Sequence, residues 1–372
     1  MTAYLFVGLI AAVVAFVMTP LVCRLSTRIG AIDHPNDRKV HAKPTPTLGG
    51  LAILLGIIAA GGVASFMPEF DRVFVQSAQP LGIGAAALVI FALGVYDDFK
   101  PLTAAPKIAG QVFAAGLLFL AGVKMQYVLL PSSVLVLGDD LSVLVTIIWI
   151  VVMINAVNLI DGLDGLAAGI VAIAAASFFV YSFNLYEVDH LTLDIAAAPL
   201  LAIIVVGAAL GFLRHNFHPA RIFMGDSGSM LLGLVLGATT LVGVGKAPTN
   251  FSPDAANVLL AYSPLWIPAL VVAIPILDAV LAIVRRVRGR RNVFHADKEH
   301  LHHRLMDLGH GHKQAVVVMY VWSALAAGAG LAFTFLDRSL WVYALPVAVA
   351  AIVLYTLFPM LTKALQNRLN AP

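Results

Sequence analysis

The 372-residue sequence has little charge and a single cysteine. Only 12% of its residues are charged, whereas 60% are hydrophobic, and its mean hydropathy is +0.94. Soluble globular domains carry about 25% charged residues, so this composition excludes a water-soluble enzyme or binding module. One cysteine, Cys23, excludes an intramolecular disulfide, and we interpret it as an inert thiol. The chain is therefore an integral membrane protein.

Eleven apolar runs are long enough to cross a bilayer, which takes about 20 residues. They cover residues 3–22, 48–67, 81–96, 106–123, 142–160, 164–183, 195–213, 228–245, 261–284, 315–335 and 340–361. The first run has no Lys or Arg before it and no small-residue cleavage site after it, so we expect a span rather than a removable signal peptide. Internal repeats, low-complexity tracts and a separate soluble domain are absent, which predicts a single domain over residues 1–372.

The basic residues predict the orientation of these spans. With the N-terminus outside and the C-terminus in the cytoplasm, 19 of the 23 Lys and Arg residues fall on the inner side. This sidedness accounts for the basic residues without nucleic acid as a partner. The outer segment MQYVLLPSSVLVLGDD (125–140) predicts a short β-hairpin turned at Pro131-Ser132-Ser133. The predicted fold is an all-α polytopic membrane protein with a small extracytoplasmic hairpin.

Five polar motifs gather on the predicted inner side. They are AIDHPNDRKVHAKPTPTLGG (31–50), VYDDFKPLT (95–103), NLIDGLDG (158–165), RHNFHPARIFMGDSGS (214–229) and FHADKEHLHHRLMDLGHGH (294–312). In the second motif, Asp97 and Asp98 end a span at its C-terminus, where the helix dipole disfavours adjacent carboxylates. Helix capping therefore cannot explain the pair, and we favour a cation or proton-transfer role over a solvated turn closed by Lys100 and Pro101.

The aspartates of the third and fourth motifs have a simpler alternative. Asp161, Asp164 and Asp226 each precede a span on the inner side, where an aspartate caps a helix. Capping needs one acceptor, however, and Asn158, Asp161 and Asp164 would fan across one wedge of a helix continued through Asp164. Together with Asp97 and Asp98, Asp226 and Asp161 offer the hard oxygen ligands that magnesium prefers.

Six of the eleven histidines lie in the last inner motif, including His300, His302 and His303. A zinc site is conceivable there, but cysteine partners and an HExxH pair are both absent, so anion binding fits better. Lys39 is either an orientation signal or a phosphate contact. Clustered carboxylates, a predicted magnesium ion and basic residues at one membrane face are typical of phosphoryl transfer to a lipid substrate.

The five motifs resemble those of the polyprenyl-phosphate N-acetylhexosamine-1-phosphate transferases, over nearly the whole chain. The resemblance implies that undecaprenyl phosphate attacks the β-phosphate of a UDP-N-acetylhexosamine and releases UMP. The loop ADKEHLHHRL looks more like the UDP-GlcNAc branch of the family, which begins envelope polysaccharide synthesis, than the phospho-MurNAc-pentapeptide translocase. The family resemblance also implies that the protein lies in a bacterial cytoplasmic membrane with its active site facing the cytoplasm. It further implies that the reaction uses Mg²⁺, with Mn²⁺ as a substitute.

The resemblance also assigns roles to residues. Asp226 would bind magnesium with support from Asp161, and Asp97, with Asp98 beside it, would deprotonate or orient the lipid phosphate. The remaining site residues would bind or contact the substrates; they are Lys39, His41, Asn158, Asp164, Asn216, Phe223, His300, His302, His303 and Arg304. The number of metal ions, a covalent aspartyl intermediate and a homodimer stay open at this point.

Two functions of other classes compete with the transferase. A secondary transporter also has many spans and buried carboxylates, but it predicts inverted repeats and ionisable groups near the bilayer midplane. Here the polar motifs crowd at one face and no repeat is visible. A structural scaffold would explain the hydrophobicity but not the five motifs, so the sequence favours an enzyme.

Overall fold

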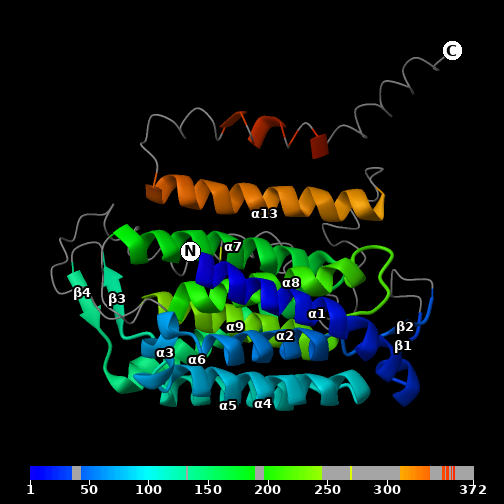
Figure 1. Ribbon diagram of the computed structural model, residues 1–372, viewed down its shortest axis with the longest axis horizontal. Coiled ribbons are helices and arrows are strands. Elements are labelled where there is room, and N and C mark those ends of the chain that lie inside the picture. The colour runs from blue at the N-terminus through cyan, green and yellow to red at the C-terminus, as the bar shows by residue number, and fades with distance from the viewer. Residues whose placement is uncertain are drawn as a thin grey trace, which may run out of the picture.

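The computed structural model describes residues 1–35, 43–130, 133–188, 197–244 and 311–335, with scattered positions between 269 and 356. These residues form a bundle of long helices lying side by side (Figure 1). The helices are α1 (Thr2–Ile29), α2 (Gly50–Ala64), α3 (Asp71–Val75), α4 (Gln79–Phe99), α5 (Ala104–Leu120), α6 (Asp139–Ile160), α7 (Leu166–Val188), α8 (Ala197–Asn216), α9 (Gly225–Val244) and α13 (His312–Phe335). The strands are β1 (Ile32–Asp33), β2 (Thr45–Pro46), β3 (Tyr127–Leu130) and β4 (Ser133–Val136).

Nine of the eleven apolar runs coincide with helices of the described part. Seven of these helices are long and apolar enough to cross a membrane, and α5 is a shorter apolar helix. Helix α2 continues through a 3-10 turn (Pro68–Phe70) into α3 with a bend of 96°, and this pair makes an eighth candidate if it is one span. The run at 261–284 and most of 340–361 lie outside the described residues. A multi-span helical protein is therefore supported, whereas eleven spans and the sidedness stay predictions.

Helix α9 occupies the centre of the bundle. It packs against α2, α4, α6 and α8, and its side chains from Met230 to Ala238 are almost all fully buried. The outer helices instead expose large apolar side chains, such as Leu9 and Phe16 on α1. A bilayer solvates such a face, so the exposed residues fit a lipid-facing surface. The end of the fourth predicted motif, FMGDSGS, thus begins the most deeply buried of the described helices.

The two small sheets lie at opposite ends of the bundle (Figure 1). At one end β1 pairs antiparallel with β2, with Ile32 opposite Pro46. At the other end β3 pairs antiparallel with β4, with Leu130 opposite Ser133, inside the segment that the sequence assigns to a hairpin. Its position outside the membrane stays a prediction.

Glycines let three helices meet where α9 begins. A Cβ atom at Gly94 of α4 would lie 2.4 Å from Ser227 Cα, and one at Gly50 of α2 would lie 2.4 Å from the backbone nitrogen of Gly228. These distances are shorter than any real Cβ contact, so only glycine permits the crossings. The start of α9 therefore contacts α2 and α4 backbone to backbone. This close contact sets the positions of the polar residues near the ends of these helices, among them Asp97 of α4 and Asp226 of α9.

Candidate active site

Backbone hydrogen bonds join the first predicted motif to the fourth. The Phe223 N–H donates to Pro46 O (2.8 Å), and Gly49 N–H donates to Phe223 O (2.9 Å). A third bond runs from Gly50 N–H to Met224 O (2.9 Å). Residues 46–50 therefore lie beside residues 223 and 224, which lead into α9. Lys39 and His41 belong to the same motif but lie outside the described residues.

Asp98 caps the N-terminus of α9. Its Oδ1 accepts the Asp226 N–H (2.8 Å) and its Oδ2 accepts the Ser227 N–H (3.2 Å). Gly225 has φ +70°, and a Cβ there would lie 2.6 Å from Asp98 Oδ2. The sequence argument that capping cannot explain the pair Asp97 and Asp98 was wrong for Asp98, because it considered only the helix that Asp98 ends. The same cap means that the Asp226 side chain is not needed to cap its own helix.

Asp97 and Asp226 share one cation, Lys107 of α5. Lys107 Nζ lies 2.7 Å from Asp97 Oδ2 and 2.8 Å from Asp226 Oδ2. Asn158 Nδ2 donates to Asp226 Oδ1 (2.6 Å) and to Ser229 Oγ (2.9 Å), and Leu102 N–H donates to Asp97 Oδ1 (2.6 Å). The structure therefore brings Asp97, Asp226 and Asn158 together around a lysine, with residues from α4, α5, α6 and α9.

The sequence analysis missed Lys107, although a signal was present. Lys107 lies in the first turn of α5, where the helix dipole disfavours a cation. Asp97 stands at the C-terminal end of α4, where the dipole disfavours an anion. Each residue is badly placed for its own helix, and the ion pair between them compensates both. The dipole rule that marks the aspartates as unfavourably placed also marks Lys107, although it does not say which carboxylates Lys107 contacts.

A second polar layer lies one helical turn deeper in the bundle. Gln111 of α5, four residues after Lys107, is fully buried, and its Oε1 accepts the Asn155 Nδ2 (2.6 Å). Gln111 Nε2 lies 3.6 Å from Met230 Sδ of α9. Buried amides inside a membrane bundle are costly unless paired, so this layer joins the three helices that carry Lys107, Asn158 and Asp226.

Asp161 and Asp164 do not continue α6. The helix ends at Ile160, and a turn containing Gly162 and Gly165, the latter at φ +81°, leads into α7. The wedge predicted for Asn158, Asp161 and Asp164 on one continued helix is therefore wrong. No described residue donates a hydrogen bond to the Asp161 carboxylate. Burial, reinforced by the charges of Asp226 and Asp98, raises the pKa of that carboxyl well above its usual range.

Asp164 points toward the segment after α8. His218 Nδ1 lies 2.7 Å from Asp164 Oδ2, and Ala220 N–H donates to the same oxygen (3.0 Å). Asn216, predicted to line the nucleotide pocket, is buried; its Oδ1 accepts the Gly165 N–H (3.0 Å) and its Nδ2 donates to Ile222 O (3.0 Å). Its amide is thus committed to holding two loops together. Phe223 is half-buried beside them.

The predicted histidine loop, with His300, His302, His303 and Arg304, lies outside the described residues. Near Asp226, the oxygen atoms that could hold a magnesium ion belong to the carboxylates of Asp226 and Asp161 and the amide of Asn158. Asp226 holds Lys107 and Asn158 in the structure, whereas Asp161 has no described donor. A half-buried carboxylate that accepts no hydrogen bond from a described residue, and that feels the charge of a second carboxylate, suits a hard divalent cation. The residues present therefore fit magnesium.

The chain is similar in sequence to known membrane transferases, in agreement with the motifs described above. The model of glycosyl transferase family 4 matches residues 80–244. The chain is 40% identical to decaprenyl-phosphate N-acetylglucosaminephosphotransferase of Mycolicibacterium smegmatis, over 96% of this chain and 88% of that protein. It is 36% identical to the probable undecaprenyl-phosphate N-acetylglucosaminyl 1-phosphate transferase of Bacillus subtilis, over 84% of this chain and 80% of that protein. The undecaprenyl-phosphate alpha-N-acetylglucosaminyl 1-phosphate transferase of Salmonella typhi is 27% identical, over 83% of this chain and 78% of that protein.

Proposed function

This chain belongs to glycosyl transferase family 4, and we propose that it transfers N-acetylglucosamine 1-phosphate from UDP-N-acetylglucosamine to a polyprenyl phosphate. We place the reaction at the cytoplasmic face of a bacterial cytoplasmic membrane. The observation that carries the proposal is the meeting of Asp97, Lys107, Asn158 and Asp226 from four helices at one end of an apolar bundle. Relatives with that named activity align over nearly the whole chain.

In the proposed reaction, an oxygen of the lipid phosphate attacks the β-phosphorus of the donor. The bond from that phosphorus to the bridging oxygen breaks, and UMP leaves with the electron pair. Direct attack needs no general base, because the lipid phosphate is already ionised. Both oxygens of Asp97 already hold donors, Lys107 and the Leu102 N–H, so we assign Asp97 the positioning of Lys107. The ammonium of Lys107 then stabilises negative charge on the phosphates.

Asp226 and Asp161 would hold a magnesium ion. Such an ion binds phosphate oxygens and stabilises the charge that develops during phosphoryl transfer. Asn158 keeps Asp226 in place through its 2.6 Å hydrogen bond. Lys39, His41, His300, His302, His303 and Arg304 stay proposed phosphate or sugar contacts.

The test is UMP release by the full-length protein purified in detergent. Undecaprenyl and decaprenyl phosphate are offered separately as acceptors, because the relatives differ in this part of their names. UDP-N-acetylglucosamine and UDP-MurNAc-pentapeptide are offered separately as donors, with and without EDTA. UMP from the first donor, lost on chelation and restored by magnesium, is the expected result. Release only from the pentapeptide donor would move the chain to the other branch, and silence with both donors in folded protein would overturn the proposal.

A further inference from the structure

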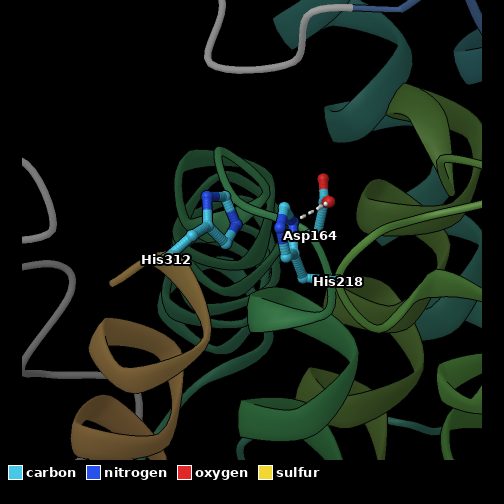
Figure 2. Close-up of side chains that lie close together, drawn as sticks. All are labelled: Asp164, His218 and His312. Atoms are coloured by element: carbon cyan, nitrogen blue, oxygen red, sulfur yellow. Dashed lines mark hydrogen bonds and ion pairs between the residues drawn. The ribbon is translucent and has the colours of Figure 1, made fainter. Parts of the chain in front are cut away.

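A second cluster brings together Asp164 from the turn after α6, His218 from the segment after α8 and His312 from the start of α13 (Figure 2). His218 Nδ1 is 2.7 Å from Asp164 Oδ2, and the His218 ring stacks on the His312 ring with centroids 4.1 Å apart and planes at 21°. His218 is therefore confined between a carboxylate from the α6–α7 turn and the first residue of α13.

The three side chains lie close enough to suggest a metal site, but the stacked rings argue against one. The lone pair of an imidazole nitrogen lies in the plane of its ring, and zinc binds at about 2.0–2.1 Å along that direction. Two rings stacked nearly parallel do not direct their lone pairs at a common point. One of the two rings would have to turn out of the stack, so the observed arrangement serves another purpose.

The cluster instead holds the Asp164 side chain through one carboxylate oxygen and leaves the other oxygen without a hydrogen bond from a described residue. Oδ2 accepts both the His218 Nδ1 and the Ala220 N–H, and no described residue donates to the other carboxylate oxygen. Figure 2 shows that this second oxygen points away from His218. His312 Nε2 is buried and has no hydrogen-bond partner among the described residues. Unsatisfied polar atoms in a part-buried site are typical of ligand contacts.

The same turn is anchored from two other directions. Gly165 N–H donates to Asn216 Oδ1, and Tyr320 of α13 donates through its hydroxyl to Gly165 O (2.5 Å). The backbone beside Asp164 is thus held by α8 and α13, and the Asp164 oxygen that accepts no hydrogen bond from a described residue remains for a ligand. A carboxylate repels phosphate, so that ligand group must carry an N–H or O–H.

We propose that His218, backed by His312, is a positioning residue that fixes Asp164 so that its free oxygen accepts an N–H or O–H of the donor nucleotide. This inference rests on the proposed function for the identity of the nucleotide. The accepted group is either an N–H of the base or a ribose hydroxyl. In both cases His218 acts on donor affinity and nucleotide selectivity, and it does not touch the reacting phosphates.

The test measures binding of UMP, CMP and 2′-deoxy-UMP to the purified full-length protein by isothermal titration, without acceptor. His218→Asn keeps an N–H near the position of Nδ1, whereas His218→Leu removes it. His215→Leu is the matched control, because His215 contacts Phe16 instead of Asp164. If His218→Leu does not fold, His218→Gln takes its place, since its amide N–H is displaced from Asp164 Oδ2.

We expect His218→Leu to weaken UMP binding by about tenfold or more, since the hydrogen bond that holds the Asp164 carboxylate is lost, while His218→Asn stays within about threefold of the wild type. A collapse of the UMP-to-CMP preference in His218→Leu assigns the contact to the base. A collapse of the UMP-to-deoxy-UMP preference assigns it to the ribose. In turnover, KM for the donor rises and kcat stays within about twofold.

Three outcomes would overturn the proposal. These are no UMP binding by the wild type, unchanged preferences in His218→Leu, or His218→Asn binding as weakly as His218→Leu. Failure of the proposed function looks different: UMP binding that depends on His218, without release of UMP from any UDP-sugar, keeps this inference and removes the reaction.

Discussion

Replacing Lys107 by methionine should damage both the activity and the stability of the protein. Methionine has nearly the length of lysine but no charge, so packing in α5 is largely kept. The ammonium lies 2.7 Å from Asp97 Oδ2 and 2.8 Å from Asp226 Oδ2, with 18% of the lysine side chain and 6% of the Asp97 side chain exposed. Without it, two neighbouring carboxylates lose their shared counter-charge.

The size of the effect follows from these distances. Coulomb's law at an effective dielectric constant of about 20 gives roughly 6 kcal/mol for each contact before desolvation. Desolvation of the ammonium and repulsion between the carboxylates offset much of this. Breaking a buried ion pair costs about 3–5 kcal/mol, and we expect the lower end, because 32% of the Asp226 side chain is exposed. Loss of a preorganised cation lowers kcat by about 100-fold or more.

Thermal unfolding in detergent and UMP release measure the two effects. Lys100→Met is the matched control: it removes the same charge from the residue that follows α4, where Lys100 is exposed. We expect a lower Tm and a lost rate for Lys107→Met, and wild-type behaviour for Lys100→Met. Added magnesium should raise the Tm of Lys107→Met more than that of the wild type, because a cation then meets unneutralised carboxylates.

If Lys107→Met and Lys100→Met behave alike, Lys107 neither stabilises the two carboxylates nor supports the reaction. A lower Tm with an unchanged rate would leave Lys107 a structural role and remove it from the phosphate site. A lost rate with an unchanged Tm would mean that the carboxylates find another counter-charge in the folded protein.

Three further predictions concern the same end of the bundle. Asp226→Asn and Asp97→Asn should each abolish UMP release while the proteins remain folded by circular dichroism; normal turnover in either would exclude its role. The pKa of the Asp161 carboxyl is higher in the folded protein than in the unfolded chain, so at a pH between these two pKa values the folded protein binds more protons. Ionisation of Asp161 therefore lowers the stability of the fold as the pH rises. Without magnesium, Asp161→Asn should therefore have a higher Tm than the wild type at about pH 8, with the gap closing toward about pH 4; an equal gap at both pH values would contradict this. Gln111→Leu removes the Gln111–Asn155 hydrogen bond and leaves the Asn155 amide with its 2.7 Å bond to Val151 O; it should cost about 1–3 kcal/mol, which the double variant with Asn155→Leu partly restores, and purely additive losses would argue against a coupled layer.

Hydropathy was enough to predict the helices, because a residue in lipid must satisfy its backbone polar groups within its own helix. All nine predicted runs that fall within the well-described part coincide with helices. The family was also predictable, because motifs in sequence carry the chemistry of a site.

The partners of individual side chains were less accessible. Asp98 caps a helix that begins 127 residues later, and Lys107 reaches Asp226 across 119 residues. No local pattern in the chain reports such contacts, which depend on how helices pack. The break between Asp161 and Asp164 was predictable in part, since the two glycines of that turn favour bending over helix.

The glycine contacts at the start of α9 limit how this protein can diverge or be redesigned. Gly50 and Gly94 bring α2 and α4 against α9 with no side chain between them. No side chains between these helices can therefore adjust to change the distance between Asp97 and Asp226. A larger residue at Gly50 or Gly94 would push the helices apart and move the carboxylates relative to each other. Variation that changes donor preference must arise elsewhere, in the segments that approach this crossing. A mutant library for new sugar nucleotides should keep both glycines and randomise the loop at residues 217–221.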